Sequence, residues 1–245
     1  GTVKKTPLAE FSRPRPSGII ALDLRADDQL VGVALTEGDK DIMLFTDTGK
    51  VIRFPEQDVR SMGRTACGVR GIRLGDEDRV VDMIVAAPDR FLLTACENGF
   101  GKRTPIEDYP TKGRGGKGVI NIRTEGRNGH VVGMVLCRED DEVILITESG
   151  MIVRSPITEM RPMGRNTQGV RVVNLKDGDR LVGVELVSAE DLTQYQITAR
   201  PRPIEPLEPA GDDADDDDVD TGDDDAGDDR PIEAPEVEDD TPDAE

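Results

Sequence analysis

Short apolar runs recur along the chain, and polar turn residues separate each run from the next. Three examples are IMLF (42–45), FLLTA (91–95) and VILIT (143–147). Runs of this length, rich in Ile, Val, Leu and Phe and bounded by turn residues, are typical of β-strands. The pattern requires no helix, so it predicts an all-β fold.

Pairs of these runs are joined by segments that contain one glycine. The segments are TDTGK, CENGF and TESGM, and they contain Gly49, Gly99 and Gly150. A glycine between two strands suits a hairpin turn, where the backbone needs a positive φ. Each of the three segments is therefore predicted to connect two antiparallel strands.

The chain repeats itself with a period near 50 residues. A basic residue followed two positions later by proline occurs at Lys5, Arg53, Arg103 and Arg154, at separations of 48, 50 and 51 residues. A glycine that opens a β-branched run occurs at Gly18, Gly68, Gly118 and Gly169, at separations of 50, 50 and 51 residues. An apolar pair begins at Leu30, Val80, Val131 and Leu181. Three features that keep the same phase over four copies indicate an array of similar structural units.

Each unit holds roughly four short strands, which is the content of a β-propeller blade. Such blades bury their faces only against neighbouring blades. We therefore predict a partial blade over 1–41, blades over about 42–90, 91–141 and 142–190, and a linker and tail over 191–245. The first copy lacks the strand that precedes the turn glycine in the other copies, so we expect further units upstream. Tandem small barrels are the alternative arrangement.

Charge is distributed very unevenly along the chain. Residues 205–245 hold 21 of the 51 acidic residues and one of the 31 basic ones, Arg230. The rest of the chain holds 30 of each and is neutral. A segment of this composition has too little apolar surface to offset the entropy cost of ordering, so the acidic tail is predicted to be disordered. Its hypothetical role is to compete with phosphates for basic residues elsewhere in the chain; the alternative is a tail that only aids solubility.

Few residues suggest catalysis or metal binding. Cys67, Cys96 and Cys137 are far apart in sequence and form no CxxC pair, so neither a zinc site nor a disulfide framework is indicated, and a reducing cytoplasm fits. No apolar run is long enough for a membrane span. His130, the only histidine, is interpreted as an ordinary loop residue, and Tyr109 as a packing residue. The adjacent acids at 140–142 are interpreted as a solvated turn.

Basic residues concentrate in the loop that precedes each repeated glycine: SRPRPSG, RSMGRTACG, KGRGGKG and RPMGRNTQG. Because blades are related by rotation, a cation at the same loop of each blade would form a stripe that a duplex phosphate backbone can follow. The alternative is that these side chains are solvated loop residues that pair with acids. The candidate DNA-binding residues are Lys4, Lys5, Arg13, Arg15, Arg60, Arg64, Lys112, Arg114, Lys117, Arg161 and Arg165.

Glycines accompany the cations in the third copy of this loop. Gly113, Gly115, Gly116 and Gly118 surround Arg114 and Lys117. Glycine lets backbone N–H groups approach phosphates closely, as in anion nests. The string lacks the GxxxxGK[ST] spacing of a nucleotide-binding loop. Aromatic residues make up 3% of the chain and Trp is absent, so sequence-tolerant binding to phosphates is expected rather than base reading. A propeller that binds a protein partner through its loops is the competing interpretation.

Several long phrases identify a family. NGFGKRTPIEDYPTKGRGGKGVINI, MGRTACGVRGIRL, GTVKKTPLAEF and MGRNTQGV resemble the C-terminal domain of the bacterial DNA gyrase A subunit, over residues 1–187. Residues 112–118 match the family's box, Gln-Arg-Arg-Gly-Gly-Lys-Gly, at five of seven positions. Because this segment aligns with the regular loop of the other copies, it is interpreted as a box-like repeat element and not as the box itself. The C-terminal domain of topoisomerase IV is the near relative.

The resemblance implies a β-pinwheel, a propeller-like disc whose blades exchange an outer strand and whose basic perimeter wraps DNA. It implies an A2B2 assembly with the gyrase B subunit and the A-subunit cleavage core, located in the cytoplasm at the nucleoid. There, wrapping would support ATP-driven negative supercoiling. The resemblance places the catalytic tyrosine, ATP and Mg²⁺ in other parts of the assembly, so no catalysis and no cofactor are expected of this chain.

Overall fold

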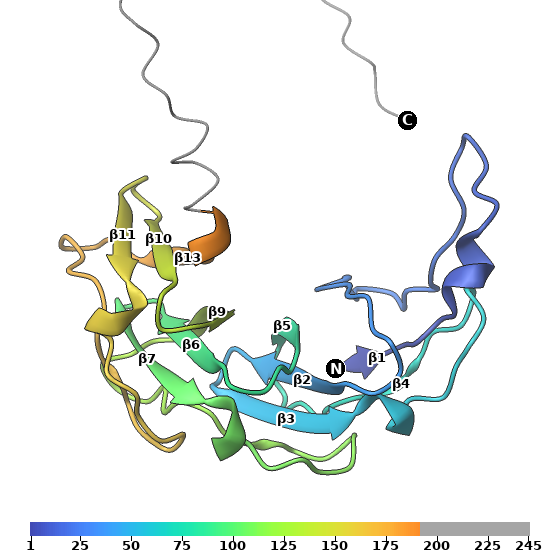
Figure 1. The fold of residues 1–245 in the computed structure, drawn as a ribbon, viewed down its shortest axis with the longest axis horizontal. Coiled ribbons are helices and arrows are strands. Elements are labelled where there is room, and N and C mark those ends of the chain that lie inside the picture. Colours follow the sequence, from blue (N-terminus) through green and yellow to red (C-terminus); the bar gives the residue numbers. More distant parts are fainter. Residues whose placement is uncertain (192–245) are drawn as a thin grey trace, which may run out of the picture. The chain divides into compact units, whose positions relative to one another are not determined.

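The computed structural model describes residues 1–191, which form β-strands joined by short loops and 3-10 helices (Figure 1). The strands are β1 (Thr2–Val3), β2 (Asp41–Thr46), β3 (Lys50–Pro55), β4 (Val69–Arg70), β5 (Val80–Val85), β6 (Phe91–Cys96), β7 (Phe100–Pro105), β8 (Val119–Ile120), β9 (Val131–Cys137), β10 (Glu142–Thr147), β11 (Ile152–Pro156), β12 (Val170–Arg171) and β13 (Leu181–Val187). The 3-10 helices are η1 (Leu8–Phe11), η2 (Glu56–Asp58), η3 (Ile106–Asp108) and η4 (Ile157–Glu159). The predicted disorder of the acidic tail concerns residues outside the described range.

Within residues 1–191, the strands form two four-stranded sheets, one three-stranded sheet and one two-stranded pair. Their orders are β5-β2-β3-β8, β12-β7-β6-β9, β11-β10-β13 and β1-β4. All of these pairings are antiparallel. The predicted all-β, propeller-like fold of four-stranded blades is confirmed, and tandem small barrels are not what the chain forms.

The outermost strand of each four-stranded sheet comes from the following repeat. Val119 of β8 pairs with Val51 of β3, and Val170 of β12 pairs with Gly101 of β7. The two-stranded pair forms in the same way, because β4 of the second repeat pairs with β1 of the first. Because each sheet is completed by the next repeat, neighbouring blades are joined by strand pairing as well as by packing. This is the strand exchange of a β-pinwheel.

The hairpin turns occur where the sequence predicts them. Gly49, Gly99 and Gly150 have φ values of 80°, 76° and 85°. Each donates its N–H to the carbonyl oxygen three residues earlier, at 3.0 Å. A side chain at such a φ is strained, so glycine is required at these turns.

The core consists of layers that lie between successive sheets. In β2, Ile42 and Leu44 pack into one cluster with Phe54, while the alternate residues Met43 and Phe45 pack into the next. Both faces of this sheet are therefore buried, as expected for a blade with neighbours on both sides. The run IMLF carries no polar residue because neither face meets water.

The last sheet is buried on one face only. In β10, Val143 and Leu145 are buried, whereas the alternate residues Ile144 and Ile146 are half-buried. The sequence of β10 is as apolar as that of β6, so its outer face differs from that of β6 because no further sheet of residues 1–191 packs on it.

Residues 18–36 differ from the equivalent part of the other repeats because they form no strand. Their counterparts β5, β9 and β13 pair with the first strand of their own repeats, and no described residue supplies that strand to the first repeat. Ile20, Val33 and Leu35 are 64%, 79% and 76% exposed.

Two smaller expectations have different outcomes. Tyr109 is a packing residue as predicted, because it is buried and its hydroxyl donates to Asn121 Oδ1 at 2.7 Å. The interpretation of residues 140–142 as a solvated turn is wrong for Asp141. That side chain is buried, and it accepts hydrogen bonds from the backbone N–H of Arg138 and of Ala189 at 2.7 and 3.0 Å. Because these bonds tie the turn before β10 to the chain that follows β13, Asp141 is structural.

Candidate nucleic-acid interface

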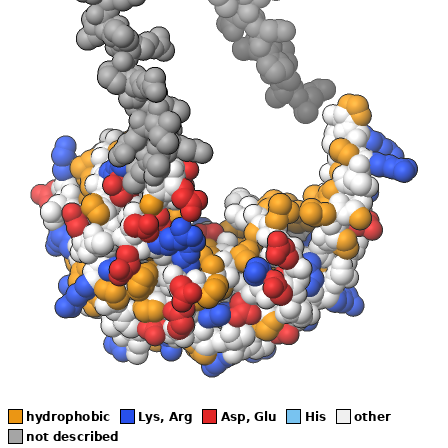
Figure 2. Space-filling view, in the orientation of Figure 1, with side chains coloured by type: hydrophobic (Ala, Val, Ile, Leu, Met, Phe, Trp, Pro, Cys, Tyr) orange, Lys and Arg blue, Asp and Glu red, His pale blue; other side chains and the backbone are white. Residues whose placement is uncertain are grey.

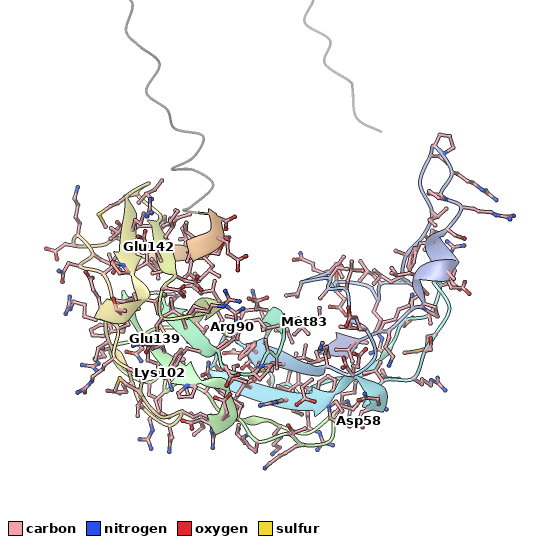
Figure 3. All side chains as sticks on the ribbon, in the orientation of Figure 1. Asp58, Met83, Arg90, Lys102, Glu139 and Glu142 are labelled. Atoms are coloured by element: carbon pink, nitrogen blue, oxygen red, sulfur yellow. The ribbon has the colours of Figure 1, made fainter. Side chains whose placement is uncertain are left out.

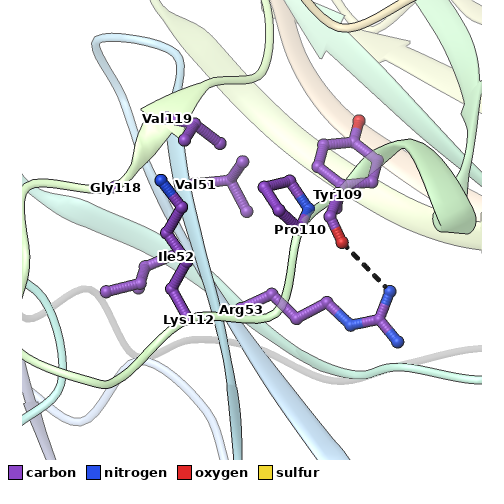
Figure 4. Close-up of a pocket in the computed structure, with 8 residues that line it drawn as sticks. All are labelled: Val51, Ile52, Arg53, Tyr109, Pro110, Lys112, Gly118 and Val119. Atoms are coloured by element: carbon purple, nitrogen blue, oxygen red, sulfur yellow. Dashed lines mark hydrogen bonds between the residues drawn. The ribbon is translucent and has the colours of Figure 1, made fainter.

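Each exchanged strand begins at the repeated glycine because the backbone passes very close to the strand that it joins. A Cβ added at Gly68 or Gly118 would lie 2.5 Å from the carbonyl oxygen of Val3 or Val51, and Gly169 approaches Gly101 in the same way. The three glycines also have φ values of 97°, 73° and 72°. Figure 4 shows Gly118 and Val119 beside Val51. The basic loop before each glycine is thereby fixed at its end to the preceding blade.

The arginine four residues before each glycine binds the backbone of the preceding repeat. Arg114 donates from Nε to the carbonyl oxygen of Asp58 and from Nη1 to that of Arg70, both at 2.9 Å. Arg165 makes the equivalent bonds to Asp108 and Ile120, at 2.7 and 3.0 Å. We refer to these arginines as staples, because each one joins its own loop to the two neighbouring elements of the preceding repeat.

Arg64 makes one of the two staple bonds. Its Nη1 donates to the carbonyl oxygen of Ile20 at 2.8 Å. The receiving residues Ile20, Arg70 and Ile120 all lie two positions after a repeated glycine. Each staple therefore binds the segment that directly follows the basic loop of the preceding repeat. As a result, the basic loops of successive repeats lie next to one another in series.

Backbone hydrogen bonds reinforce this series. The N–H of Gly115 donates to Gly71 at 2.5 Å, and the N–H of Arg73 donates to Gly116 at 2.8 Å. One repeat further on, the N–H of Arg123 donates to Thr167 at 2.9 Å. Of the four glycines of the third loop that were expected to let backbone N–H groups approach phosphates, Gly115 has its N–H bound to the neighbouring loop instead.

A lysine lies beneath the loop of the fourth repeat. Lys102, in β7, is completely buried, and its Nζ donates to the carbonyl oxygens of Gly164 and Arg165 at 2.7 and 2.6 Å (Figure 3). Lys4 is its counterpart in the first repeat and binds the carbonyl oxygens of Ala21, at 2.7 Å, and of Arg64. These lysines hold loop backbones in place, and Lys102 was not among the candidates from sequence.

The eleven candidate residues differ in how freely their charges can reach a ligand. Lys4 and Lys5 are half-buried, and Lys5 donates to the carbonyl oxygen of Glu56 at 2.9 Å. Arg64 and Arg165 are half-buried staples, whereas Arg114 is an exposed one. The remaining candidates are exposed in loops: Arg13, Arg15, Arg60, Lys112, Lys117 and Arg161.

Arg53, one of the repeated basic residues before proline, contacts the next repeat. Arg53 binds Asp41 Oδ2 at 2.8 Å and the carbonyl oxygens of Ile106 and Tyr109 at 3.0 and 3.2 Å (Figure 4). It lies beside Lys112 in a small pocket under the third loop. Its counterpart Arg103 is 5% exposed and stacks over the Phe91 ring at 4.8 Å. This repeated feature of the sequence therefore marks structural contacts.

The structure adds cations that the loop pattern did not select. Arg127 and Arg171 both lie over the Phe100 ring, at 4.6 and 5.0 Å from its centroid. Arg70 and Arg171 are exposed on exchanged strands, and Arg73 and Arg123 are exposed just beyond two of these strands. For Arg70 and Arg171 a signal was present in the alternation of the exchanged strands GVR (68–70) and GVR (169–171), which directs every second residue outward.

Lysine and arginine side chains project at intervals along the outer margin of the described residues, with acidic side chains between them (Figure 2). A series of exposed cations with backbone-bound glycine loops can contact the phosphates of a duplex without reading its bases. Within residues 1–191, no group of three His, Cys, Asp or Glu side chains is arranged to hold a metal ion. In the same range, no helix has the length and apolar character that a membrane span requires.

Comparison with protein families gives a match over most of the chain. The family described as DNA gyrase C-terminal domain, beta-propeller, matches residues 1–37, 40–87, 90–138 and 141–188. Among curated proteins, the DNA gyrase A subunit of Klebsiella oxytoca is 47% identical over 199 residues, which is 81% of this chain and 23% of the relative. The DNA gyrase A subunit of Escherichia coli K12 is 44% identical over 188 residues, which is 77% of this chain and 22% of the relative. The chain thus spans under a quarter of the length of these relatives.

Solved structures share the fold. The C-terminal domain of DNA topoisomerase IV superposes with a TM-score of 0.75 at 29% identity, covering 81% of this chain and 62% of that one. The C-terminal domain of DNA gyrase A superposes with a TM-score of 0.64 at 27% identity, covering 69% of this chain and 58% of that one.

Proposed function

The chain belongs to the family of DNA gyrase C-terminal domains, and on that premise we propose that residues 1–191 bind duplex DNA through its phosphates and bend it along the basic loops. The observation that carries the proposal is the repeated staple, in which Arg64, Arg114 and Arg165 join each loop to the segment that follows the loop before it. Because the staples place the basic loops in series, the exposed cations of these loops are available to one continuous phosphate backbone.

The binding energy in this proposal is mainly electrostatic. Exposed lysines and arginines such as Lys112, Lys117 and Arg161 would displace counterions from the duplex. No base-reading helix lies among residues 1–191, so DNA sequence would matter only through its flexibility. The loops are held by hydrogen bonds before DNA arrives, so little ordering entropy is lost on binding.

In a larger assembly, bending along the loop series would become wrapping. We propose that the chain presents a wrapped segment to the A-subunit cleavage core of an A2B2 complex with the gyrase B subunit, in the cytoplasm at the nucleoid. Strand passage would then introduce negative supercoils, with ATP and Mg²⁺ bound elsewhere in the complex. The chain itself would bind DNA without catalysing a reaction and without a cofactor.

Two alternatives lead to different expectations. A topoisomerase IV C-terminal domain shares the fold, and the structural likeness to that enzyme's domain supports it, whereas the sequence relatives are gyrase A subunits. A propeller that binds a protein partner would use the same loops, but its affinity would depend weakly on salt.

Salt titration and topology test the proposal together. The logarithm of DNA affinity should fall with the logarithm of salt concentration with a slope of roughly −4 or steeper, corresponding to several phosphate contacts. Ligation of nicked circles in the presence of the chain should shift the linking number in the positive direction. A shallow slope would favour the protein-binding alternative, and a steep slope without a linking-number shift would mean binding without wrapping.

A further inference from the structure

The third repeat contains two residues that depart from the repeated pattern and contact each other. Phe100 follows the turn glycine, where the other repeats have Thr, Lys and Met. Arg127 lies in the loop after the exchanged strand, where the other repeats have Asp, Glu and Gly. Its guanidinium lies over the Phe100 ring, 4.6 Å from the centroid. Because the other repeats form without this pair, the fold does not explain why these two residues occur together.

A second arginine lies over the same ring. Arg171 of β12 is the cross-strand partner of Phe100 in β7, and its guanidinium is 5.0 Å from the ring centroid. Phe100 and Arg127 belong to the third repeat, whereas Arg171 belongs to the fourth. The ring therefore holds two guanidinium groups close together at the joint between these repeats. Cation–π contacts of this kind restrict the orientation of side chains that are otherwise exposed.

The loop that carries Arg127 is fixed on both sides. Asn98 Nδ2, in the hairpin turn of the same repeat, donates to the carbonyl oxygen of Arg127 at 2.9 Å. Asn128 is completely buried, and its Nδ2 donates to the carbonyl oxygen of Gln168 in the fourth basic loop at 2.8 Å. Arg127 Nη2 donates to the carbonyl oxygen of Gly169 at 3.0 Å. The guanidinium is therefore positioned before a ligand arrives, so little ordering entropy is lost on binding.

The two positive charges over the ring have no acidic partner within the described residues. Exposed arginines elsewhere, such as Arg138, Arg154 and Arg180, each pair with a glutamate. Neither Arg127 nor Arg171 forms an ion pair with any acid of residues 1–191. Like charges this close repel each other, and an anion bound between them relieves the repulsion. A guanidinium stacked on a ring keeps N–H donors at its edge, and their planar fork fits a phosphate.

The joint between the second and third repeats has different residues at these positions. Lys50 takes the place of the ring, and it forms an ion pair with Asp78 at 3.6 Å. Ile120 is the partner of Lys50 in the exchanged strand, and Glu77 takes the place of the loop arginine. The pair of unneutralised arginines is therefore specific to the joint between the third and fourth repeats.

We propose that Arg127 and Arg171, oriented by the Phe100 ring, form a clamp for one phosphate of duplex DNA. This inference rests on the proposed function, because it assigns one site along the same DNA path. Gly169, which accepts the hydrogen bond from Arg127, ends the fourth basic loop, so the clamp adjoins the series of loops. Phe100 is a positioning residue, because it contacts the guanidinium groups and not the phosphate. The chain thus grips DNA more firmly at this joint than at the joint that contains Lys50.

Removing the ring tests the positioning role without changing any charge. In the complete chain, Phe100→Leu should raise the dissociation constant for a linear duplex roughly five-fold, because both guanidinium groups lose their orientation. Phe91→Leu is the matched control. Its ring also carries an arginine, Arg103, but that side chain is 5% exposed and bound to Glu139 at 3.4 Å, so DNA affinity should stay unchanged. Phe100→Tyr keeps the face of the ring and should restore the affinity. Equal affinities of the two leucine variants would overturn the proposal.

Replacing arginine by lysine separates a clamp from a diffuse positive field. Arg127→Lys with Arg171→Lys keeps the net charge, and both side chains are exposed, so the core is untouched. Affinity should fall roughly ten-fold, because lysine lacks the planar fork that binds a phosphate. Arg70→Lys with Arg73→Lys is the matched control at β4, where Arg70 pairs with Thr2 instead of an aromatic residue. It should lower the affinity by less than about three-fold.

The unchanged chain, measured in the same titrations, distinguishes failure of the clamp from failure of the proposed function. If it binds DNA with a steep salt dependence while the two lysine pairs lose affinity equally, or neither loses any, the clamp is wrong and DNA binding stands. If the unchanged chain shows no salt-dependent binding, the proposed function fails and the clamp fails with it.

Discussion

The ammonium group of Lys102 lies 2.6 Å from the carbonyl oxygen of Arg165, although the two residues belong to different repeats. The lysine is completely buried, and burial lowers its pKa to about 7, with a further lowering by the nearby Arg165 guanidinium. A buried, readily deprotonated lysine therefore supports the backbone of the arginine that staples the next loop.

Lys102 should make the stability of the chain depend on pH. Its pKa is about 7 in the folded chain and near 10.5 in the unfolded chain, so between these values the unfolded chain binds more protons. The free energy of unfolding should therefore increase as the pH is raised. From pH 7 to 8.5 the increase from this group should be about 1.5 kcal/mol. Urea unfolding at several pH values measures it.

Lys102→Met is the matched control for that measurement. It keeps the length of the side chain without a titrating group, so its unfolding free energy should lack this increase. Burial raises the pKa of the Cys96 and Cys137 thiols from 9.0 to about 12, which destabilises the folded chain only above about pH 9. Measurements up to pH 8.5 avoid this opposing effect. An equal pH dependence in both chains would show that Lys102 is not the source.

The staple at Arg165 should be sensitive to an otherwise conservative substitution. Lysine cannot reproduce the planar arrangement in which Nε and Nη1 bind two carbonyl oxygens at once. Arg165→Lys should therefore lower the unfolding free energy by about 1 kcal/mol. Arg161→Lys, in the same loop at an exposed position, should change it by less than about 0.5 kcal/mol. Equal effects would mean that the staple bonds do not stabilise the blade joint.

The glycine that opens an exchanged strand should tolerate no side chain. Gly118→Ala would place a Cβ 2.5 Å from the carbonyl oxygen of Val51 at a φ of 73°. We expect a loss of at least about 2 kcal/mol in unfolding free energy, because β8 must move away from β3. Gly113→Ala in the same loop meets nothing within 4 Å, so its effect should be small. Thermal unfolding of the two variants distinguishes a strand-exchange role from general loop flexibility.

The features that could be predicted from sequence are those that local chemistry requires. The turn at Gly49 needs a positive φ, and the β-branched run after Gly118 favours a strand, whatever surrounds them. Because both features recur every 50 residues, the repeat and its all-β character follow directly. An arginine four residues before three of the repeated glycines also predicted a shared role for Arg114. Part of that role is structural, because Arg114 binds the backbone of the preceding repeat.

The features that could not be predicted depend on contacts between distant residues. Lys102 resembles any basic residue of a strand, and its burial becomes apparent only when the loop at Gly164 lies over it. Asp141 adjoins exposed acids in sequence but binds a backbone N–H 48 residues away. Among residues 1–191 no further sheet covers the outer face of β10, because β10 belongs to the last sheet of the series, and its own sequence gives no sign of this.

The acidic tail gives a prediction that rests on its charge alone. Residues 205–245 carry 21 acidic residues and one basic residue on the same chain as the basic loops, so we expect covalent linkage to give a high effective concentration of negative charge near those loops. Deleting them should increase DNA affinity at low salt, and the gain should shrink as salt screens the charges. Unchanged affinity and unchanged wrapping at moderate salt would leave the tail without a regulatory part.

Charge reversal in the third loop tests the DNA interface separately from stability. Arg114 is unsuitable because it is a staple, but Lys112 and Lys117 are exposed. Lys112→Glu with Lys117→Glu should weaken duplex binding and make the salt slope shallower by about 2, since two phosphate contacts are lost. The unfolding free energy should change little, because neither side chain is buried.

Net charge alone could produce part of that loss, so the control must change charge equally elsewhere. Lys40→Glu with Lys176→Glu makes the same change at two lysines outside the repeated basic loops. A loop stripe predicts that only the first pair reduces the linking-number shift, because only those side chains would lie along the DNA path. If both pairs reduced binding and wrapping alike, the cations would act as a diffuse field, and the alignment of loops by Arg64, Arg114 and Arg165 would serve stability alone.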